Sequence, residues 1–167
     1  MHKSIFKNIN LLSRYDIVHI HNWYNLLSLK DIEYLVQNVE CVVITLHDQR
    51  FMTGGCHYSI KCNNFQIDCN DCPLLPKVFK DKTKHNLREQ KRIAEYSNIF
   101  FIVPSKWLYD TAKKSYVLKN ANVHLIGNFL PFKVASSVES LKNIEQIGTI
   151  KIGIASVHPY SLVKGGE

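Results

Sequence analysis

Residues 41–48, CVVITLHD, decide the fold of this chain. The run 41–46 is continuously apolar or β-branched, which is typical of a strand covered on both faces in a parallel sheet. This strand leads directly into His47 and Asp48, two titratable residues. In open α/β sheets, ligands bind at the edge formed by the carboxyl ends of the strands. The stretch therefore predicts a buried parallel sheet with His47 and Asp48 as candidate site residues at its edge.

The segments on either side alternate between strands and helices. Apolar residues recur at helical spacing over 25–37, whereas the other strand candidates are short apolar runs. Strands are expected at 16–21, 41–46, 98–105 and 122–128, and helices at 4–12, 25–37, 80–96 and 106–117. This alternation predicts an α/β fold with a doubly wound, Rossmann-like parallel sheet.

The alternation stops after residue 128. Residues 129–148 lack strand or helix periodicity and are expected to form a linker, whereas 150–157, IKIGIASV, is another buried strand. We therefore expect one Rossmann-like domain over 1–128, with a cysteine-rich loop at 54–76, a linker at 129–148, and the start of a second domain over 149–167. A single strand and loop cannot form a domain alone, so the chain is expected to be a fragment.

Composition excludes several classes of protein. The 167 residues are 46% hydrophobic and 21% charged, which is ordinary for a soluble globular protein. No apolar run approaches the roughly 18 residues of a membrane span, and the first residues do not resemble a signal peptide, so a cytoplasmic location is expected. The formal net charge of +7 favours anionic partners: nucleotide phosphates, nucleic acid or an anionic membrane face.

The cysteine-rich loop is a candidate metal site. Thiols stay reduced in the cytoplasm, so the loop is not expected to carry disulfides. The last two cysteines of the loop form a Cys-x-x-Cys pair, which brings two thiolates within reach of one ion. The four candidate ligands are Cys56, Cys62, Cys69 and Cys72.

A zinc ion held by four sulfurs would be structural, because catalytic zinc keeps one coordination position open. His57 could replace one thiolate. The alternative is a loop with incidental, redox-sensitive thiols. Cys41 stands apart from this group and is expected in the core.

Several other polar residues have two interpretations. His47 can contact phosphate or hydroxyl groups of a ligand, or can serve as a capping or packing histidine. His19 and His21 lie two residues apart on a strand, share one face and could line the same crevice. Lys164 and Gly165 resemble a phosphate-contacting loop, although a plain turn has the same composition.

Four short motifs together resemble the bacterial family 4 glycosyltransferases, particularly those that build exopolysaccharide and O-antigen. These are TLHD at 45–48, TGGCHY at 53–58, CNDCP at 69–73 and PSKW at 104–107. They occur in the order found in that family.

The resemblance implies a GT-B fold, in which two Rossmann-like domains enclose the active site. It also implies transfer of a sugar from a nucleotide-sugar donor, with retention at the anomeric carbon and without a catalytic metal. His47, followed by Asp48, would face the cleft near the transferred sugar. Lys164, followed by Gly165, would hold the donor diphosphate.

A complete GT-B enzyme needs about 300 residues for two domains. The resemblance therefore implies a partial GT-B fold, which consists of the latter part of the N-terminal, acceptor-side domain and the first strand of the donor-side domain. Little activity is expected from it alone. The expected acceptor is a glycan or a lipid-linked glycan, at the inner face of the cell membrane. The alternative is a small, zinc-stapled basic module that contacts nucleic acid, but the lysines are scattered and no nucleic-acid motif is present.

Overall fold

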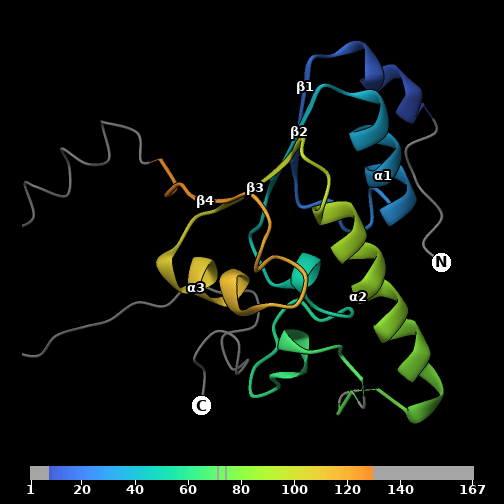
Figure 1. Cartoon of the computed structure of the whole chain (residues 1–167), viewed down its shortest axis with the longest axis vertical. Coiled ribbons are helices and arrows are strands. Elements are labelled where there is room, and N and C mark those ends of the chain that lie inside the picture. The colour runs from blue at the N-terminus through green and yellow to red at the C-terminus, as the bar shows by residue number, and fades with distance from the viewer. Residues whose placement is uncertain (1–7, 71, 74, 130–167) are drawn as a thin grey trace, which may run out of the picture. The chain divides into compact units, whose positions relative to one another are not determined.

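Four parallel strands form one sheet in the order β1-β2-β3-β4 in the computed structural model of the chain (Figure 1). The structure describes residues 8–70, 72–73 and 75–129. The strands span Ile17–His21 (β1), Cys41–Thr45 (β2), Ile99–Val103 (β3) and Val123–Leu125 (β4). Consecutive strands are connected by α1 (Leu29–Asn38), α2 (Lys80–Ala94) and α3 (Lys106–Lys114). The predicted α/β fold with a parallel sheet is confirmed.

Short 3-10 helices occupy parts of the connections. They are η1 (Ile9–Arg14), η2 (Arg50–Met52), η3 (Asn64–Gln66) and η4 (Lys77–Phe79). The helix expected at 4–12 is thus a 3-10 helix that begins at Ile9, and residues 1–7 lie outside the described residues.

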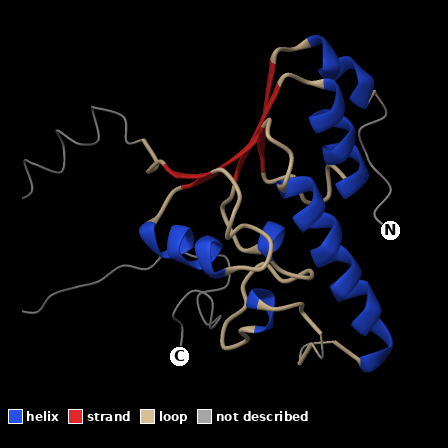
Figure 2. Ribbon diagram, viewed as in Figure 1, coloured by secondary structure: helices blue, strands red, loops and turns tan. Residues whose placement is uncertain are grey.

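One face of the sheet is fully buried. Side chains alternate between the two faces of a strand, so every second residue of each strand points toward the helices. Val42, Ile44 and Phe101 on this face have no exposed surface, and Ile32 of α1 and Leu87 of α2 belong to the same apolar cluster. Figure 2 shows α1, α2 and α3 on the same side of the sheet.

The opposite face is only partly covered among the described residues. Ile17 is 62% exposed, and Val43, Phe100 and Ile102 are half-buried. Coverage of both faces, expected from the apolar run 41–46, is therefore not found in this part of the chain. The strand order explains the difference, because crossovers of one hand that all advance in the same direction place their helices on one face.

Helix α1 begins four residues later than predicted, after Ser28. The Ser28 side chain accepts a hydrogen bond from the Asp31 backbone N–H, and the Asp31 carboxylate accepts one from the Ser28 backbone N–H. This capping box fixes the first turn. Asn25, which was expected inside the helix, has a φ of 63°, and this left-handed conformation cannot occur in a right-handed helix.

Helix α3 ends at Lys114, three residues earlier than predicted. Ser115 is extended, with a ψ of 148°, so the helix cannot continue through it. The next residue, Tyr116, donates its backbone N–H to the carbonyl oxygen of Phe65 at 3.0 Å. This bond ties the end of α3 to the cysteine-rich loop.

Residues up to Gly127 form one compact unit. The predicted linker beyond Phe129 and the predicted start of a second domain at 149–167 lie outside the described residues. None of the helices in the described part of the chain has the length and apolar character that crossing a membrane requires.

Asn98 connects the start of β3 to the end of α1, and we expect its loss to destabilise the fold. Its side-chain Nδ2 donates to the carbonyl oxygens of Val36 at 2.8 Å and Val39 at 2.9 Å. Asn98→Ala would remove the donor from both carbonyls, and leaving a buried polar group unpaired costs about 1–3 kcal/mol. Urea unfolding should show a loss of free energy in this range.

Asn38→Ala is the matched control. Asn38 is exposed, lies at the same end of α1, and donates only to the Tyr34 carbonyl within its own helix. Its substitution should change the free energy of unfolding by no more than about 0.5 kcal/mol. Equal effects of the two substitutions would contradict the role given to Asn98.

Candidate functional site

The carboxyl ends of β1 and β2 bring two histidines together. The register pairs His21 with Thr45, so His47 follows its strand next to His21. His21 Nδ1 lies 3.3 Å from His47 Nε2, and the two rings stack with centroids 5.6 Å apart. Both side chains are exposed. The predicted position of His47 at the carboxyl edge of the sheet is confirmed.

His19 extends this pair along the partly covered face of the sheet. Its ring centroid lies 4.3 Å from that of His21, and its Nε2 lies 2.8 Å from Thr45 Oγ1. Burial lowers the pKa of His19 below its usual value, and the neighbouring His21 lowers it further. The prediction that His19 and His21 share a face is confirmed. We call His19, His21 and His47 the histidine row.

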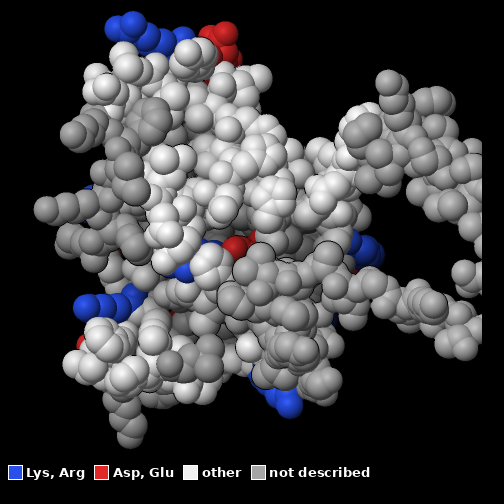
Figure 3. All heavy atoms as spheres, turned by 180° about the vertical axis from the view of Figure 1, so that it is seen from behind, with Lys and Arg blue, Asp and Glu red and all other residues white. Residues whose placement is uncertain are grey.

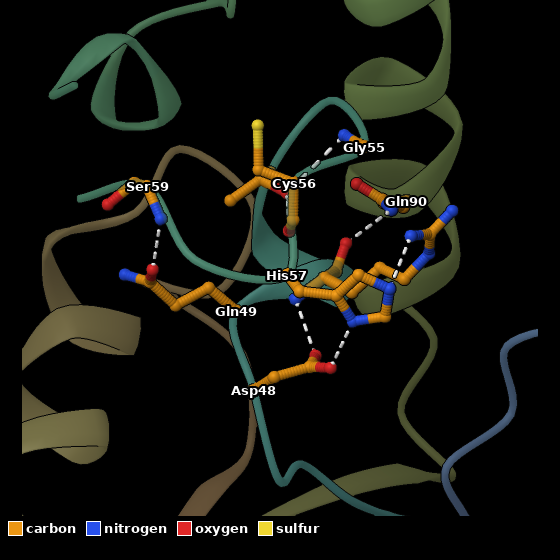
Figure 4. Close-up of polar contacts among 9 residues, drawn as sticks. Asp48, Gln49, Gly55, Cys56, His57, Ser59 and Gln90 are labelled. Carbon is orange, nitrogen blue, oxygen red and sulfur yellow. Dashed lines mark hydrogen bonds and ion pairs between the residues drawn. The ribbon is translucent and has the colours of Figure 1, made fainter. Parts of the chain in front are cut away.

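Asp48 turns inward and binds the loop that follows it. Its Oδ2 accepts from His57 Nδ1 at 2.6 Å, and its Oδ1 accepts from the Arg50 backbone N–H at 2.8 Å (Figure 4). Arg50 Nη1 lies 2.9 Å from His57 Nε2. A guanidinium only donates, so Nε2 must accept and the proton of a neutral His57 lies on Nδ1, from which it is donated to Asp48. Asp48 therefore orients His57.

Tyr24 packs against both partners of this network. The guanidinium carbon of Arg50 lies 3.4 Å from the centroid of the Tyr24 ring, and the same ring meets His57 edge-on at 5.0 Å. Burial lowers the pKa of Arg50, whereas Tyr24 and Asp48 raise it. An arginine remains charged in such surroundings. The network thus places one positive charge close to His47.

A small pocket lies where these groups meet. Its lining comes from the residues that follow β1 and β2, and it includes Asn22, Trp23, Tyr24, His47, Asp48 and Arg50. Trp23 meets Phe51 edge-on at 5.8 Å and is half-buried against the core. The pocket has a volume of about 10 Å³, room for about one water, and combines an aromatic wall with imidazole and guanidinium groups, which can donate to oxygen atoms at its mouth.

The backbone of this loop is held from two sides. The Gln49 backbone N–H donates to the His57 carbonyl at 2.8 Å, and the buried Gln49 side chain accepts from the Ser59 backbone N–H at 2.5 Å (Figure 4). Gln90 of α2 donates to the Arg50 carbonyl at 3.0 Å. These bonds keep residues 48–50 and 57–59 side by side.

The cysteine-rich loop encloses a separate cavity of about 260 Å³. All four predicted ligands line it: Cys56, Cys62, Cys69 and Cys72. None of them forms a disulfide. Burial raises the pKa of the Cys69 thiol to about 11, although a hydrogen bond from the Gly54 backbone N–H at 3.2 Å opposes this rise. The structure therefore brings the predicted cysteines around one space.

The four thiols do not form a metal site in this arrangement. Among the residues that the structure describes, no group of three or more His, Cys, Asp or Glu side chains is placed to hold one ion. His57 does not face the cavity as a ligand, because both of its ring nitrogens bind Asp48 and Arg50. Lys164 and Gly165, the predicted contacts of the donor diphosphate, lie outside the described residues.

Sequence reasoning missed the roles of His57, Arg50 and Tyr24. One available signal was the Gly54-Gly55 turn, which lies between Asp48 and His57, close to His57, and reverses the chain so that the two can meet. No sequence pattern indicates the contact between Tyr24 and Arg50.

Comparisons of the chain with protein-family models, with curated proteins and with solved structures find no match.

Gly54 allows the loop to approach α2, and we expect its substitution to separate them. A Cβ at this position would lie 2.8 Å from Thr83 Cβ and 3.0 Å from Cys69 Cβ, which is closer than carbon atoms can pack. Gly54→Ala should therefore lower the free energy of unfolding by about 1–3 kcal/mol, the usual cost of overpacking, as measured by urea unfolding.

Gly127→Ala is the control, because a Cβ there has no neighbour within 4 Å among the described residues. It should leave the free energy of unfolding almost unchanged. A Gly54→Ala variant as stable as this control would show that the close approach is not required.

Proposed function

We propose that this chain is the acceptor-side part of a retaining, nucleotide-sugar-dependent glycosyltransferase with the GT-B fold. The proposal combines the four motifs that resemble family 4 glycosyltransferases with the geometry of the carboxyl edge. The observation that carries it is the contact between His21 and His47, at 3.3 Å, beside the pocket that follows β1 and β2.

His47 is the residue proposed to contact the transferred sugar. It is exposed, lies at the end of a buried strand, and its ring can donate to or accept from a sugar hydroxyl. His21 lies next to it and limits the positions that the His47 ring can take. A hydrogen bond from a fixed imidazole would hold the sugar while the reaction proceeds.

In the proposed reaction, the bond between the anomeric carbon and the donor diphosphate breaks. A new bond forms from that carbon to the acceptor hydroxyl oxygen, and the hydroxyl proton passes to the leaving diphosphate. Positive groups near the diphosphate would stabilise its developing charge. Lys164 and Gly165 are proposed for that contact. Arg50 supplies a further positive charge at the pocket that follows β1 and β2.

Asp48 has a supporting role in this proposal. Both of its carboxylate oxygens accept hydrogen bonds within the loop, from His57 and from the Arg50 backbone. It therefore positions His57 and Arg50 at the pocket and does not itself exchange protons with the substrate.

The proposed acceptor is a glycan, free or linked to a lipid. The net charge of +7 suits both a diphosphate donor and weak association with an anionic membrane surface. Nucleic acid is the less favoured anionic partner, since Lys and Arg atoms lie in several separate groups on the face that Figure 3 shows.

The first test is ligand binding by the 167-residue chain. A panel of nucleotide sugars and short oligosaccharides should shift the ring resonances of His21 and His47 in NMR spectra, with little effect on His85, which is exposed on α2. Binding of single-stranded oligonucleotides that weakens steeply with salt, without any saccharide response, would instead support the nucleic-acid module.

The second test concerns His47 in a transferase that joins this domain to a donor-side domain. His47→Ala should lower the turnover about 10²-fold, in the range for a positioned polar or acid–base group, because the sugar loses a fixed hydrogen-bond partner. The melting temperature should change little, because the side chain is exposed.

His85→Ala is the matched control, and its turnover should equal that of the unmodified enzyme. Normal turnover of the His47→Ala variant would show that His47 does not contribute to sugar transfer. A loss of activity that follows a large loss of stability would place it in the core instead.

A further inference from the structure

We propose that Cys56, Cys62, Cys69 and Cys72 bind one zinc ion, and that this ion positions His57 for its contact with Asp48. The inference goes beyond the transferase proposal and does not depend on it. It concerns how the loop is held, whatever ligand the pocket binds.

The loop lacks the apolar core that would otherwise hold it. Between residues 55 and 75, Phe65 is the only buried apolar side chain among the described residues. Ile60, Ile67 and Leu75 are 59%, 70% and 44% exposed. A segment of this length with so little buried apolar surface needs another source of stability, and small units of this kind commonly use a metal.

The backbone of the loop also contains strained residues. Ile60 has a φ of 50° and Cys69 a φ of 51°, in the left-handed region. This conformation costs roughly 1–2 kcal/mol for a residue with a Cβ, and for a β-branched residue it is rare. Such residues persist where their surroundings over-determine them, which a metal bound at both sides of Ile60, through Cys56 and Cys62, would do.

The side chains of the cavity that zinc prefers as ligands are all thiols. Four thiols line it, and four thiolates in a tetrahedron are a preferred site for zinc, at about 2.3 Å from metal to sulfur. Cys69 Sγ accepts a hydrogen bond from the Gly54 backbone N–H at 3.2 Å, which holds this sulfur at the cavity wall.

Since no three potential ligands among the described residues are placed to hold one ion, binding must draw the sulfurs inward. A tetrahedral site places sulfurs about 3.8 Å apart, and the volume of about 260 Å³ leaves room for this movement.

The path from the cavity to the candidate site is short. Cys56 directly precedes His57, and its carbonyl accepts a hydrogen bond from Thr53 Oγ1 at 2.6 Å. His57 is held in turn by Gln49 through its backbone and by Asp48 through its ring. An ion bound to Cys56 therefore fixes the residue before His57 and, through it, the orientation of the ring.

The experiment uses the full chain purified without added metal. Elemental analysis should find about one zinc per chain, and a colorimetric chelator should remove it. Cys62→Ser should lower the zinc content severalfold. Cys41→Ser is the matched control, because Cys41 lies on β2, away from the cavity lining, and this variant should keep its zinc.

The second measurement follows the tautomer of His57 by long-range nitrogen–proton NMR. Zinc-loaded protein should show a His57 ring protonated at Nδ1. Removal of zinc from the wild-type chain should shift this ring toward a mixture of tautomers, and added zinc should restore it. This readout remains valid if Cys62→Ser fails to fold.

Folded protein without bound metal would overturn the zinc site, as would bound iron or disulfides among the four cysteines. Bound zinc whose removal leaves the His57 spectrum unchanged would overturn its positioning role.

Discussion

The parallel register of β1 and β2 is the constraint on which the rest of the structure depends. Ile17 pairs with Cys41 and His21 with Thr45, so both strands end at the same edge. Because side chains alternate, a slip of one residue would turn His19 and His21 into the core and expose Val18 and Ile20. The apolar residues that must be buried therefore also fix which face carries the histidine row, and the core and the candidate site are specified together.

Helix α2 supports both the pocket and the cysteine-rich loop through two buried polar side chains. Thr83 and Gln90 are buried, with only 5% and 3% of their surface exposed. Thr83 donates to the Cys69 carbonyl at 3.0 Å, and Gln90 donates to the Arg50 carbonyl. Loop carbonyls have no strand partners, so buried donors on a neighbouring helix satisfy them. A more apolar α2 would bury more surface but would leave these carbonyls unpaired.

The central strands could be predicted from sequence because β2 and β3 are short runs of apolar and β-branched residues, and β1 because its apolar residues alternate with polar ones. The start of α1 could not be placed by apolar spacing, because Leu26 fits the helical period although the capping box begins only at Ser28. The Gly54-Gly55 turn indicates that the chain reverses between Asp48 and His57, but the pairing of the two side chains depends on the path of the whole loop. Whether the helices cover one face of the sheet or both depends on the strand order. An apolar strand has the same composition in a sheet covered on one face as in a doubly wound sheet.

The strand order also affects how the candidate site can be reached. In a doubly wound sheet, the ligand crevice lies where the strand order reverses. The described strands follow one another without reversal, so the histidine row opens instead onto the partly covered face beside β1. Apolar residues on that face, such as Ile17 and Phe100, favour a covering layer, whereas His21 and His47 are polar and exposed. Ile17 and Phe100 lie near the amino ends of their strands, whereas His21 and His47 lie at the carboxyl ends, so cover over the apolar residues is compatible with an open carboxyl edge.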